Sequence, residues 1–261
     1  MPDAILPMPV SIRRKPGVFC AFSALLVGLA ACTAPQPGAE FNDPYEATNR
    51  VVHGWNKGLD RAVLRPTGQV MTAAPVEVTQ PVRNFADNVG LPGMVVNGIL
   101  QGDIDSAATN TFRFLINSSI GVLGLFDPAT AIGLPEDTTD FGATLAVWGV
   151  PEGAYLELPV LGPSTERDAA GRIVDFALDP LRRVGTPHQV EYGTAARVAD
   201  IAITRGRFGE TFDDVLYGSA DSYAQARLAY LQNRRFELGE APPEADAIDP
   251  FSPDLSLEGF E

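Results

Sequence analysis

The chain has 261 residues, with 33 acidic and 19 basic side chains and a formal net charge of −14. A chain with this net charge repels nucleic acid and anionic lipid headgroups at long range, which argues against a protein that binds either through a broad basic surface. The length is sufficient for one large domain or two small ones.

The first 32 residues are arranged as a basic stretch, an apolar stretch and a group of small residues. Residues 13–15 are Arg-Arg-Lys, and residues 18–31 contain neither a charge nor a proline. This stretch is too short for a membrane-spanning helix, which needs about 20 apolar residues. The segment predicts a bacterial lipoprotein signal peptide over residues 1–31, with Met1 or Met8 as its start and Cys32 as the lipidated residue. A plain secretory signal with a chance cysteine is the alternative.

Cysteine occurs only at Cys20 and Cys32. Cleavage removes the first and lipidation uses the second, so the mature chain of 230 residues is expected to hold no disulfide and no thiolate metal site. The removed segment carries three basic residues and one acidic residue, which takes the net charge from −14 to −16. Contact with a membrane must then come from the acyl chains and from apolar protein surface.

Short polar segments flank the part of the chain that is expected to fold. Residues 32–42 form a tether with two prolines, and ten such residues reach at most about 35 Å when extended. The folded domain, expected over residues 43–238, therefore stays near the lipid. Residues 239–261 contain seven acids and neither Lys nor Arg, which predicts a disordered acidic tail.

Helical periodicity dominates the chain between these ends. The first helix is expected over residues 43–64, with Asp43 as its N-cap and Arg65-Pro66 as its end. A short hairpin or loop is expected near residues 153–163. The remaining helices are expected over residues 79–88 and 91–101 with a break at Gly90, then over 103–118, 140–150, 164–178, 186–205, 209–217 and 221–238. The pattern predicts an all-α fold.

Two glycines lie one turn apart in the first helix, at Gly54 and Gly58, on either side of Trp55. Each glycine costs about 1 kcal/mol relative to alanine in a helix interior. Close packing against another helix is one explanation, and it is the one we favour. The other is a flexible point with a functional use.

Residues 119–134 contain one charged residue in sixteen and several glycines. The segment is too short and too interrupted to span a bilayer. Burial in the core and contact with a membrane or lipid are equally compatible with this composition. In the helix before it, Arg113 is the only basic residue, and we favour a partly buried ion pair there over a lipid phosphate.

Signals for catalysis are weak. The two histidines, His53 and His188, lie far apart in sequence and belong to no His-Glu-x-x-His motif. Residues 217–221 lack the Gly-x-Ser-x-Gly pattern of a nucleophile elbow, and no Gly-Lys-Ser/Thr follows the glycines at 90–93. We therefore expect no enzyme, no metal and no cofactor.

Several short sequence motifs occur in an order that resembles a known protein family. The resemblance covers residues 43–230, and the block over residues 81–127 is its most specific part. The blocks are Asp43-Pro44-x-Glu46 with Asn49-Arg50, Pro81-Val-Arg83-Asn84-Phe85, Val96-Asn97 with Leu100-Gln101-Gly102-Asp103, Thr111-x-Arg113-Phe114-x-x-Asn117-Ser118, Gly121-x-x-Gly124-x-x-Asp127, Phe141-Gly142-x-Thr144-Leu145 and Trp148-Gly149-Val150. Together they are similar to the VacJ/MlaA outer-membrane lipoprotein family.

The resemblance implies a ring-like helical domain with a central amphipathic passage, lipid-anchored at the periplasmic face of the outer membrane of a Gram-negative bacterium. It implies removal of mislocalised phospholipid from the outer leaflet and its transfer to a soluble periplasmic carrier. It also implies association with a trimeric porin. A structural lipoprotein that supports a porin without moving lipid is the alternative.

A route for phospholipid must be polar in one part and apolar in another. Segments 91–101 and 119–134 are the candidates for lipid-facing or passage-lining elements, because both carry little charge. The candidate positions are Val96, Asn97, Gln101, Arg113, Gly121 and Gly124. Tryptophan at Gly121 or Gly124 is expected to block the passage without unfolding the protein.

The first helix departs from the pattern that the resemblance implies. Thr48 stands before the Asn-Arg pair, where family members often have Phe, and residues 53–56 read His-Gly-Trp-Asn in place of an aromatic-Asn-aromatic run. The segment of Gly54, Trp55 and Gly58 is therefore the candidate flexible point of this chain.

Overall fold

The computed structural model describes residues 41–240, except for the side chains of residues 181 and 184. The predicted signal peptide, Cys32, nearly all of the tether and all but the first two residues of the acidic tail lie outside this range. None of the helices within residues 41–240 is both long and apolar enough to cross a membrane.

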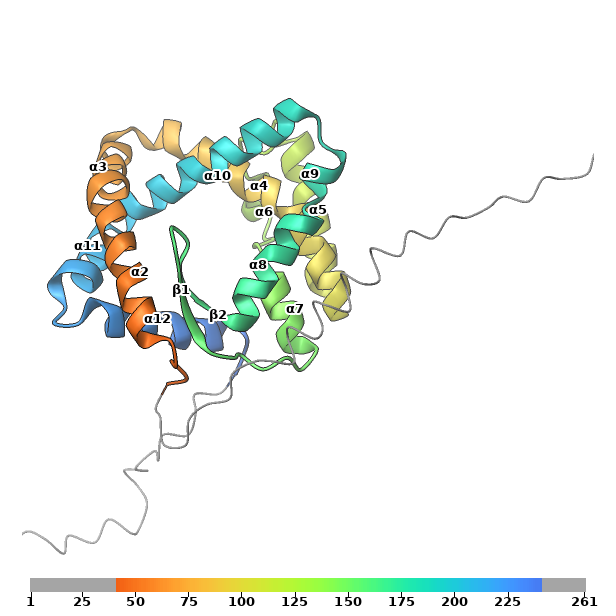
Figure 1. Cartoon of the computed structure of the whole chain (residues 1–261). Coiled ribbons are helices and arrows are strands. Elements are labelled where there is room, and N and C mark those ends of the chain that lie inside the picture. Colours follow the sequence, from red (N-terminus) through yellow and green to blue (C-terminus); the bar gives the residue numbers. More distant parts are fainter. Residues whose placement is uncertain (1–40, 241–261) are drawn as a thin grey trace, which may run out of the picture.

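The helices follow one another around a ring, with a two-stranded hairpin inside it (Figure 1). The predicted helical ring and the hairpin near residues 153–163 are confirmed. In chain order the elements are α2 (Glu46–Leu59), the π-helical turn η1 (Asp60–Leu64), α3 (Arg65–Ala73), α4 (Val76–Gln101), α5 (Ile104–Ser119), α6 (Pro128–Ala131), α7 (Phe141–Val147), β1 (Tyr155–Leu158), β2 (Gly162–Thr165), α8 (Glu166–Leu178), α9 (Pro180–Val184), α10 (Pro187–Arg207), α11 (Gly209–Asp213), the π-helical turn η2 (Asp214–Gly218) and α12 (Ser222–Glu237).

Three of these elements, α2, η1 and α3, form one continuous helical rod. The prediction that the first helix ends at Arg65-Pro66 is wrong. A proline in a helix interior lacks an N–H donor, and its ring clashes with the carbonyl four residues before it. Here the π-helical turn η1, whose hydrogen bonds reach one residue further along the chain, ends directly before Arg65. This wider turn accommodates Pro66 within the rod.

The start of α2 also differs from the prediction. Tyr45 occupies the N-cap position and its side chain does not cap the helix, so Asp43 is not the cap. The carboxylate of Asp43 instead accepts a hydrogen bond from Asn49 at 3.0 Å and further bonds from Tyr223 and Arg227 of α12. Asp43 therefore ties the first helix of the ring to the last.

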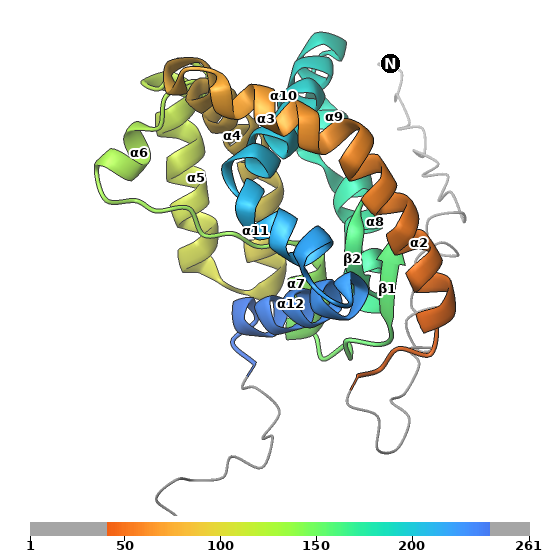
Figure 2. The same ribbon diagram turned by 90° about the vertical axis from the view of Figure 1, so that its left-hand side faces the viewer.

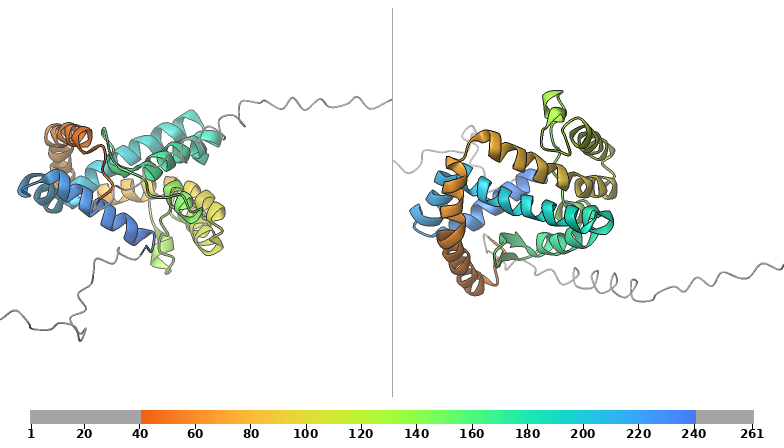
Figure 3. Two further views of the ribbon diagram at one scale, coloured as in Figure 1. Left: turned by 60° about the horizontal axis from the view of Figure 1, so that its bottom comes forward. Right: turned by 90° about the horizontal axis from the view of Figure 1, so that it is seen from above.

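The fourth helix, α4, runs unbroken for 26 residues. The predicted break at Gly90 is wrong, and Pro92 is tolerated as well. The helix packs against both α5 and α10, which lies beside it in Figure 3. Tertiary packing of this kind outweighs the helix propensity of single residues. The helix ends at Gly102, whose φ of 77° is the left-handed conformation typical of a helix C-terminus.

Side-chain caps mark the starts of several other helices. Asp103, Asp140 and Thr186 cap α5, α7 and α10, at the residues where these three helices are expected to begin. The start of α8 lies one residue later than predicted, with Thr165 in place of Ser164 as its N-cap. Strand β2 runs through Thr165, and the side chain of this last strand residue accepts from the N–H of Asp168.

Two asparagine side chains hold the hairpin against α2 (Figure 2). Asn49 donates to the backbone oxygen of Tyr155 at 3.0 Å and accepts from the backbone N–H of Glu157 at 3.0 Å. Asn56 accepts from the backbone N–H of Val160 at 2.7 Å. A carboxamide offers one acceptor and two donors, so each asparagine satisfies strand groups that would otherwise lack a partner. The hairpin is thereby fixed to the α2 side of the ring.

Candidate functional site

A cavity of about 530 Å³, which we call the ring cavity, lies between α2, the hairpin, α10, α11, η2 and α12. Its lining combines apolar and charged groups. The apolar side chains come from six elements and are Leu59, Leu64, Val160, Leu161, Ile201, Phe212, Val215 and Leu216. The polar side chains include His53, Asn56, Lys57, Asp60, Glu157 and Arg205. A molecule with both a charged and an apolar part matches such a lining.

The charged part of the ring cavity is centred on Arg205. Its Nε and Nη2 donate to the two oxygens of Asp60 at 2.6 and 3.0 Å, and Nη2 also donates to Asp213 at 2.6 Å. Tyr217 donates to Asp60 at 2.8 Å. The hydrogen bonds that Arg205 donates to Asp60 raise the pKa of Arg205, so this guanidinium stays charged. Because Asp60 and Arg205 are buried, their pairing holds η1 against α10 beside the cavity.

Three groups near the cavity have the order of a hydrolase triad. The Oγ of Ser222 lies 3.1 Å from Nε2 of His53, and Nδ1 of His53 lies 3.4 Å from a Glu157 oxygen. A hydrolase also needs N–H donors for its oxyanion. The N–H of the next residue, Tyr223, is bonded to a carboxylate, and Lys57 donates to the serine oxygen at 3.3 Å. These groups therefore act as cross-links between α2, the hairpin and α12.

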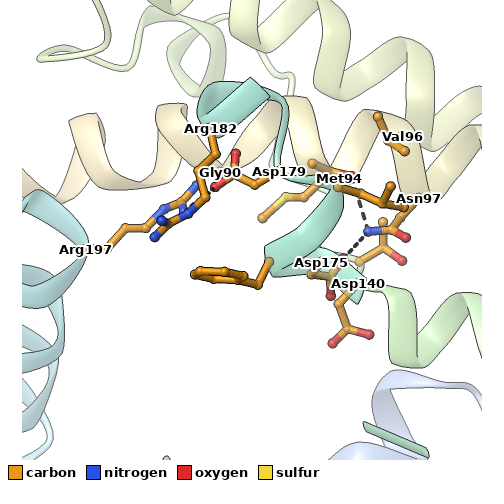
Figure 4. A pocket seen from close by; sticks show the side chains of 13 residues that line it. Gly90, Met94, Val96, Asn97, Asp140, Asp175, Asp179, Arg182 and Arg197 are labelled. Atoms are coloured by element: carbon orange, nitrogen blue, oxygen red, sulfur yellow. Dashed lines mark hydrogen bonds and ion pairs between the residues drawn. The ribbon is translucent and has the colours of Figure 1, made fainter. Parts of the chain in front are cut away.

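A second cavity of about 330 Å³, which we call the rim pocket, lies between α4, α8, α9 and the middle of α10. Figure 4 shows Arg182, Asp179 and Arg197 at one end of it and Asn97 and Asp175 at the other. Asn97 donates to Asp175 at 2.8 Å. Burial raises the pKa of the Asp175 carboxyl group. The rim pocket therefore has an arginine end and a carboxyl end.

A comparison with known protein families gives a match over nearly all of the described residues. A family model described as MlaA lipoprotein matches residues 41–237. The chain belongs to the MlaA lipoprotein family. The resemblance that the sequence blocks carry is thereby confirmed.

Individual relatives in this family cover the chain to different extents. The intermembrane phospholipid transport system lipoprotein MlaA of Escherichia coli (strain K12) is 32% identical over 250 residues, which is 90% of this chain and 96% of that protein. The protein of the same name from Haemophilus influenzae is 29% identical and covers 82% of this chain and 86% of its own length. An uncharacterized protein of Rickettsia felis is 40% identical over 54% of this chain, and the match spans 57% of that protein.

A solved structure supports the same relationship. It is described as the structural basis for maintenance of bacterial outer membrane lipid asymmetry. Its TM-score is 0.65 at 30% sequence identity, and the match covers 75% of this chain and 98% of that chain. The helical ring described above is therefore the MlaA fold.

Two of the predicted passage positions of this MlaA-family chain line a cavity. Val96 and Asn97 both border the rim pocket. Gln101, one turn further along α4, donates instead to Thr139 at 2.7 Å and to Thr144 at 2.9 Å. Its amide is thus committed to a link between α4 and α7. Whether these positions contact lipid stays a prediction.

Arg113 of α5 is 3% exposed and forms an ion pair with Asp127 at 3.2 Å. It also donates to Thr130 at 2.9 Å and to the backbone oxygen of Leu134. The favoured interpretation as an ion pair is confirmed. These bonds hold the segment over residues 127–134 against α5, so Arg113 stabilises the fold here.

Gly121 and Gly124 lie where the chain turns back on the end of α5. A Cβ atom on Gly121 would collide with the backbone oxygens of Asn117 and Phe126, and one on Gly124 would collide with the side chain of Asn88. The prediction that tryptophan at either position leaves the fold intact is therefore wrong. Both glycines are required by close packing.

The matched pair Gly121→Ala and Gly54→Ala tests this packing. Gly121→Ala is expected to lower the free energy of unfolding by about 1–3 kcal/mol, the usual cost of an overpacked site. Gly54→Ala is expected to raise it by about 0.5–1 kcal/mol, because nothing lies within 4 Å of a Cβ there and alanine favours a helix. Urea unfolding of the two variants beside the wild type measures both. Equal effects at the two positions would contradict the packing argument.

The apolar segment over residues 119–134 lies at the surface. Its burial in the core, one of the two alternatives, is contradicted by the exposure of most of its large side chains. Figure 2 shows this segment with α5 and α6 on one side of the molecule and α2 with the hairpin on the opposite side. The exposed residues are Ile120, Val122, Leu123, Leu125, Phe126 and Ile132, together with Phe112 and Leu115 of α5. We call this group of exposed apolar side chains the α5–α6 face.

The two glycines of α2 have no neighbour to pack against. A Cβ atom on Gly54 or Gly58 would meet nothing within 4 Å, and Trp55 between them is 68% exposed. Close packing, the explanation that the sequence favours, is therefore wrong. The flexible point stays a prediction, and the π-helical turn η1 begins two residues after Gly58.

Several cavity residues are absent from the sequence-based candidates, above all Asp60, Arg205, Arg182 and Arg197. Each is a charged residue in a helix that contains other charged residues. Its sequence neighbours therefore do not show whether its side chain lines a cavity or faces solvent. A signal does exist for Asp60, because it follows the unusual glycine pair of the first helix. Only the helix pairing of the ring brings it to Arg205.

Proposed function

We propose that this chain is a lipid-anchored lipoprotein of the outer membrane that removes mislocalised phospholipid from the outer leaflet and passes it to a soluble periplasmic carrier. The observation that carries the proposal is the ring cavity, which presents charged and apolar side chains within one helical ring. Family membership and the relatives named for intermembrane phospholipid transport support it.

The chemistry of a phospholipid explains why such a cavity suits it. A charged headgroup is costly to place among apolar groups without a partner, whereas acyl chains gain from contact with them. Lys57, Asp60 and Arg205 supply charge in the ring cavity, and Val160 and Leu161 at the hairpin tip supply apolar surface. The role is passive, so the chain acts as a transport component and not as a catalyst.

The α5–α6 face supports a position in the membrane surface. Groups of exposed apolar side chains of this kind mark contacts with membranes or proteins on a soluble domain. Lipidated Cys32, on a tether of about ten residues before α2, would keep the folded domain close to the inner leaflet. A trimeric porin in the same membrane and a periplasmic lipid carrier are the proposed protein partners.

Filling the ring cavity tests the proposal. Ala229 of α12 lines the cavity and is itself exposed, so Ala229→Trp should place an indole in the cavity without disturbing the core. Gln225, one turn earlier on the same helix, is exposed and does not line the cavity, so Gln225→Trp is the matched control. Each variant is expressed in a strain that lacks the gene.

The readout is the amount of phospholipid in the outer leaflet, measured by its accessibility to an added phospholipase. We expect Ala229→Trp to leave phospholipid in the outer leaflet as in the deletion strain, and Gln225→Trp to restore the wild-type level. Normal removal by a folded Ala229→Trp variant would exclude the ring cavity as the route. Phospholipid that copurifies with the wild type separates transport from a purely structural role beside a porin, because a scaffold should carry none.

A further inference from the structure

Two arginines at the end of the rim pocket share a single carboxylate. Nη1 of Arg197 lies 3.1 Å from Oδ2 of Asp179, and Nε of Arg182 lies 3.7 Å from the same oxygen. Within residues 41–240 no other carboxylate lies within 4 Å of either guanidinium. Two positive charges therefore face one negative charge at this end of the pocket.

This imbalance sets the pair apart from the buried arginines of the ring. Arg205 has the carboxylates of both Asp60 and Asp213 within 3.0 Å, and Arg234 has two carboxylates within 3.0 Å. In a chain with a net charge of −14, most cations are neutralised by a nearby acid. The excess of positive charge is confined to this end of the pocket, where two guanidinium groups face one carboxylate, and it points to an anionic ligand there.

The surroundings of the two arginines suit the part of a phospholipid where the headgroup phosphate meets the acyl chains. The guanidinium of Arg182 lies over the ring of Phe176, 4.2 Å from its centre. That stacking holds the plane of the guanidinium while its outer N–H groups stay accessible. Met94 and Leu178 add apolar lining, and the volume of about 330 Å³ lies within the range of small-molecule sites.

We propose that the guanidinium groups of Arg182 and Arg197 bind the phosphodiester of a phospholipid headgroup in the rim pocket. The planar fork of N–H groups on an arginine matches the oxygens of a phosphate. The start of the acyl chains lies along the apolar lining that Met94 and Leu178 provide. The proposal rests on the proposed function, because it names the group by which that lipid is held.

The distance between the two ends of the rim pocket determines which parts of a headgroup the site can contact. Arg197 donates to the backbone oxygen of Val89, and Asp175 accepts from Asn97, eight residues further along α4. Eight helical residues span about 12 Å, which is more than one ethanolamine arm reaches. Asp175 is therefore out of reach of a headgroup amine, and Asp179 already pairs with the two arginines. Phosphatidylethanolamine and phosphatidylglycerol are thus expected to bind alike.

Binding of short-chain lipids to the detergent-purified full chain tests the site by calorimetry. The probes are dihexanoyl phosphatidylethanolamine, dihexanoyl phosphatidylglycerol, dihexanoylglycerol without phosphate, and inorganic phosphate. We expect the two phospholipids to bind the wild type with dissociation constants within about threefold of each other. The Arg182→Gln/Arg197→Gln double variant is expected to bind both about tenfold or more weakly, as the loss of charge-assisted hydrogen bonds implies. Its binding of dihexanoylglycerol should equal that of the wild type.

Two further variants control for charge and folding. Arg183→Gln removes the same charge from the neighbouring residue, which bonds to the backbone oxygen of Ala177 and does not line the pocket, so lipid binding should stay unchanged. Gly93→Leu keeps both arginines and fills the pocket from α4, where a Cβ meets nothing within 4 Å. This variant should fold normally and lose phospholipid binding about tenfold or more.

Failure of the inference and failure of the proposed function give different results. If the wild type binds phospholipid and both Arg182→Gln/Arg197→Gln and Gly93→Leu bind it equally well, the headgroup site lies elsewhere and the proposed function stands. Binding of inorganic phosphate as tight as that of the lipids would show a free-anion site and overturn the assignment to lipid. No phospholipid binding by the wild type would overturn the proposed function itself.

Discussion

Asp60→Ala is expected to lower the free energy of unfolding by about 3–5 kcal/mol, the cost of removing one partner of a buried ion pair. Asp60 is 5% exposed and accepts two hydrogen bonds from Arg205 and one from Tyr217. Alanine at this position leaves the buried guanidinium of Arg205 with only Asp213 as a counter-charge. Urea unfolding followed by circular dichroism measures the loss.

A matched acid and a double variant make the Asp60 result specific. Asp214, the first residue of η2, is exposed, so Asp214→Ala should change stability by less than about 0.5 kcal/mol. Asp60→Leu/Arg205→Met removes both charges and should cost clearly less than the sum of the two single changes. A cost for Asp60→Ala no larger than that for Asp214→Ala would show that the pair contributes little to closing the ring.

Gly206→Val is expected to lower the free energy of unfolding by at least about 3 kcal/mol or to prevent the protein from accumulating. The helices α3 and α10 touch through their backbones at Gly68 and Gly206. A Cβ atom on Gly68 would lie 2.8 Å from the backbone nitrogen of Gly206, and one on Gly206 would collide with the carbonyl group of Gly68. Neither backbone can move away without separating the two helices, which places this change among the severe overpacking cases.

The control for this crossing is Gly58→Val, in the same helical rod as Gly68. A Cβ there meets nothing within 4 Å, so valine should cost less than about 0.5 kcal/mol. Thermal unfolding of both variants gives the comparison. Because α3 and α10 close one corner of the ring, a surviving fraction of Gly206→Val should also bind less phospholipid. A Gly206→Val protein as stable as the wild type would refute the tight crossing.

Structural features that depend on a few neighbouring residues are the ones that sequence reasoning predicts well. The starts of α5, α7 and α10 are of this kind, because the side chains of Asp103, Asp140 and Thr186 each bond to a backbone N–H only three residues away. The hairpin near residues 153–163 is another, since its strands are joined by a short turn. In these cases the partners come together whatever the rest of the chain does.

Predictions of helix ends were wrong where a single proline or glycine was the only signal. Pro66 lies within a continuous rod and Gly90 lies within α4. One such residue costs about 1–3 kcal/mol in a helix, which the packing of a long helix against two neighbours exceeds. Gly121 and Gly124 show the opposite error. The sequence suggests that larger residues fit at these positions, whereas contacts with neighbouring atoms require glycine.

By itself, the sequence determined the features that composition and ordered motifs encode. These are the helical class and the family, whose motifs occur in order along residues 43–230. The signal peptide and the lipidation of Cys32 stay predictions from the sequence. The tertiary structure alone decided where the cavities lie and which charges line them. Asp60 and Arg205 are 145 residues apart in the chain, and Arg182 meets Arg197 only because α9 turns back beside α10. Such pairs form when helices close into a ring, and no local pattern contains that information.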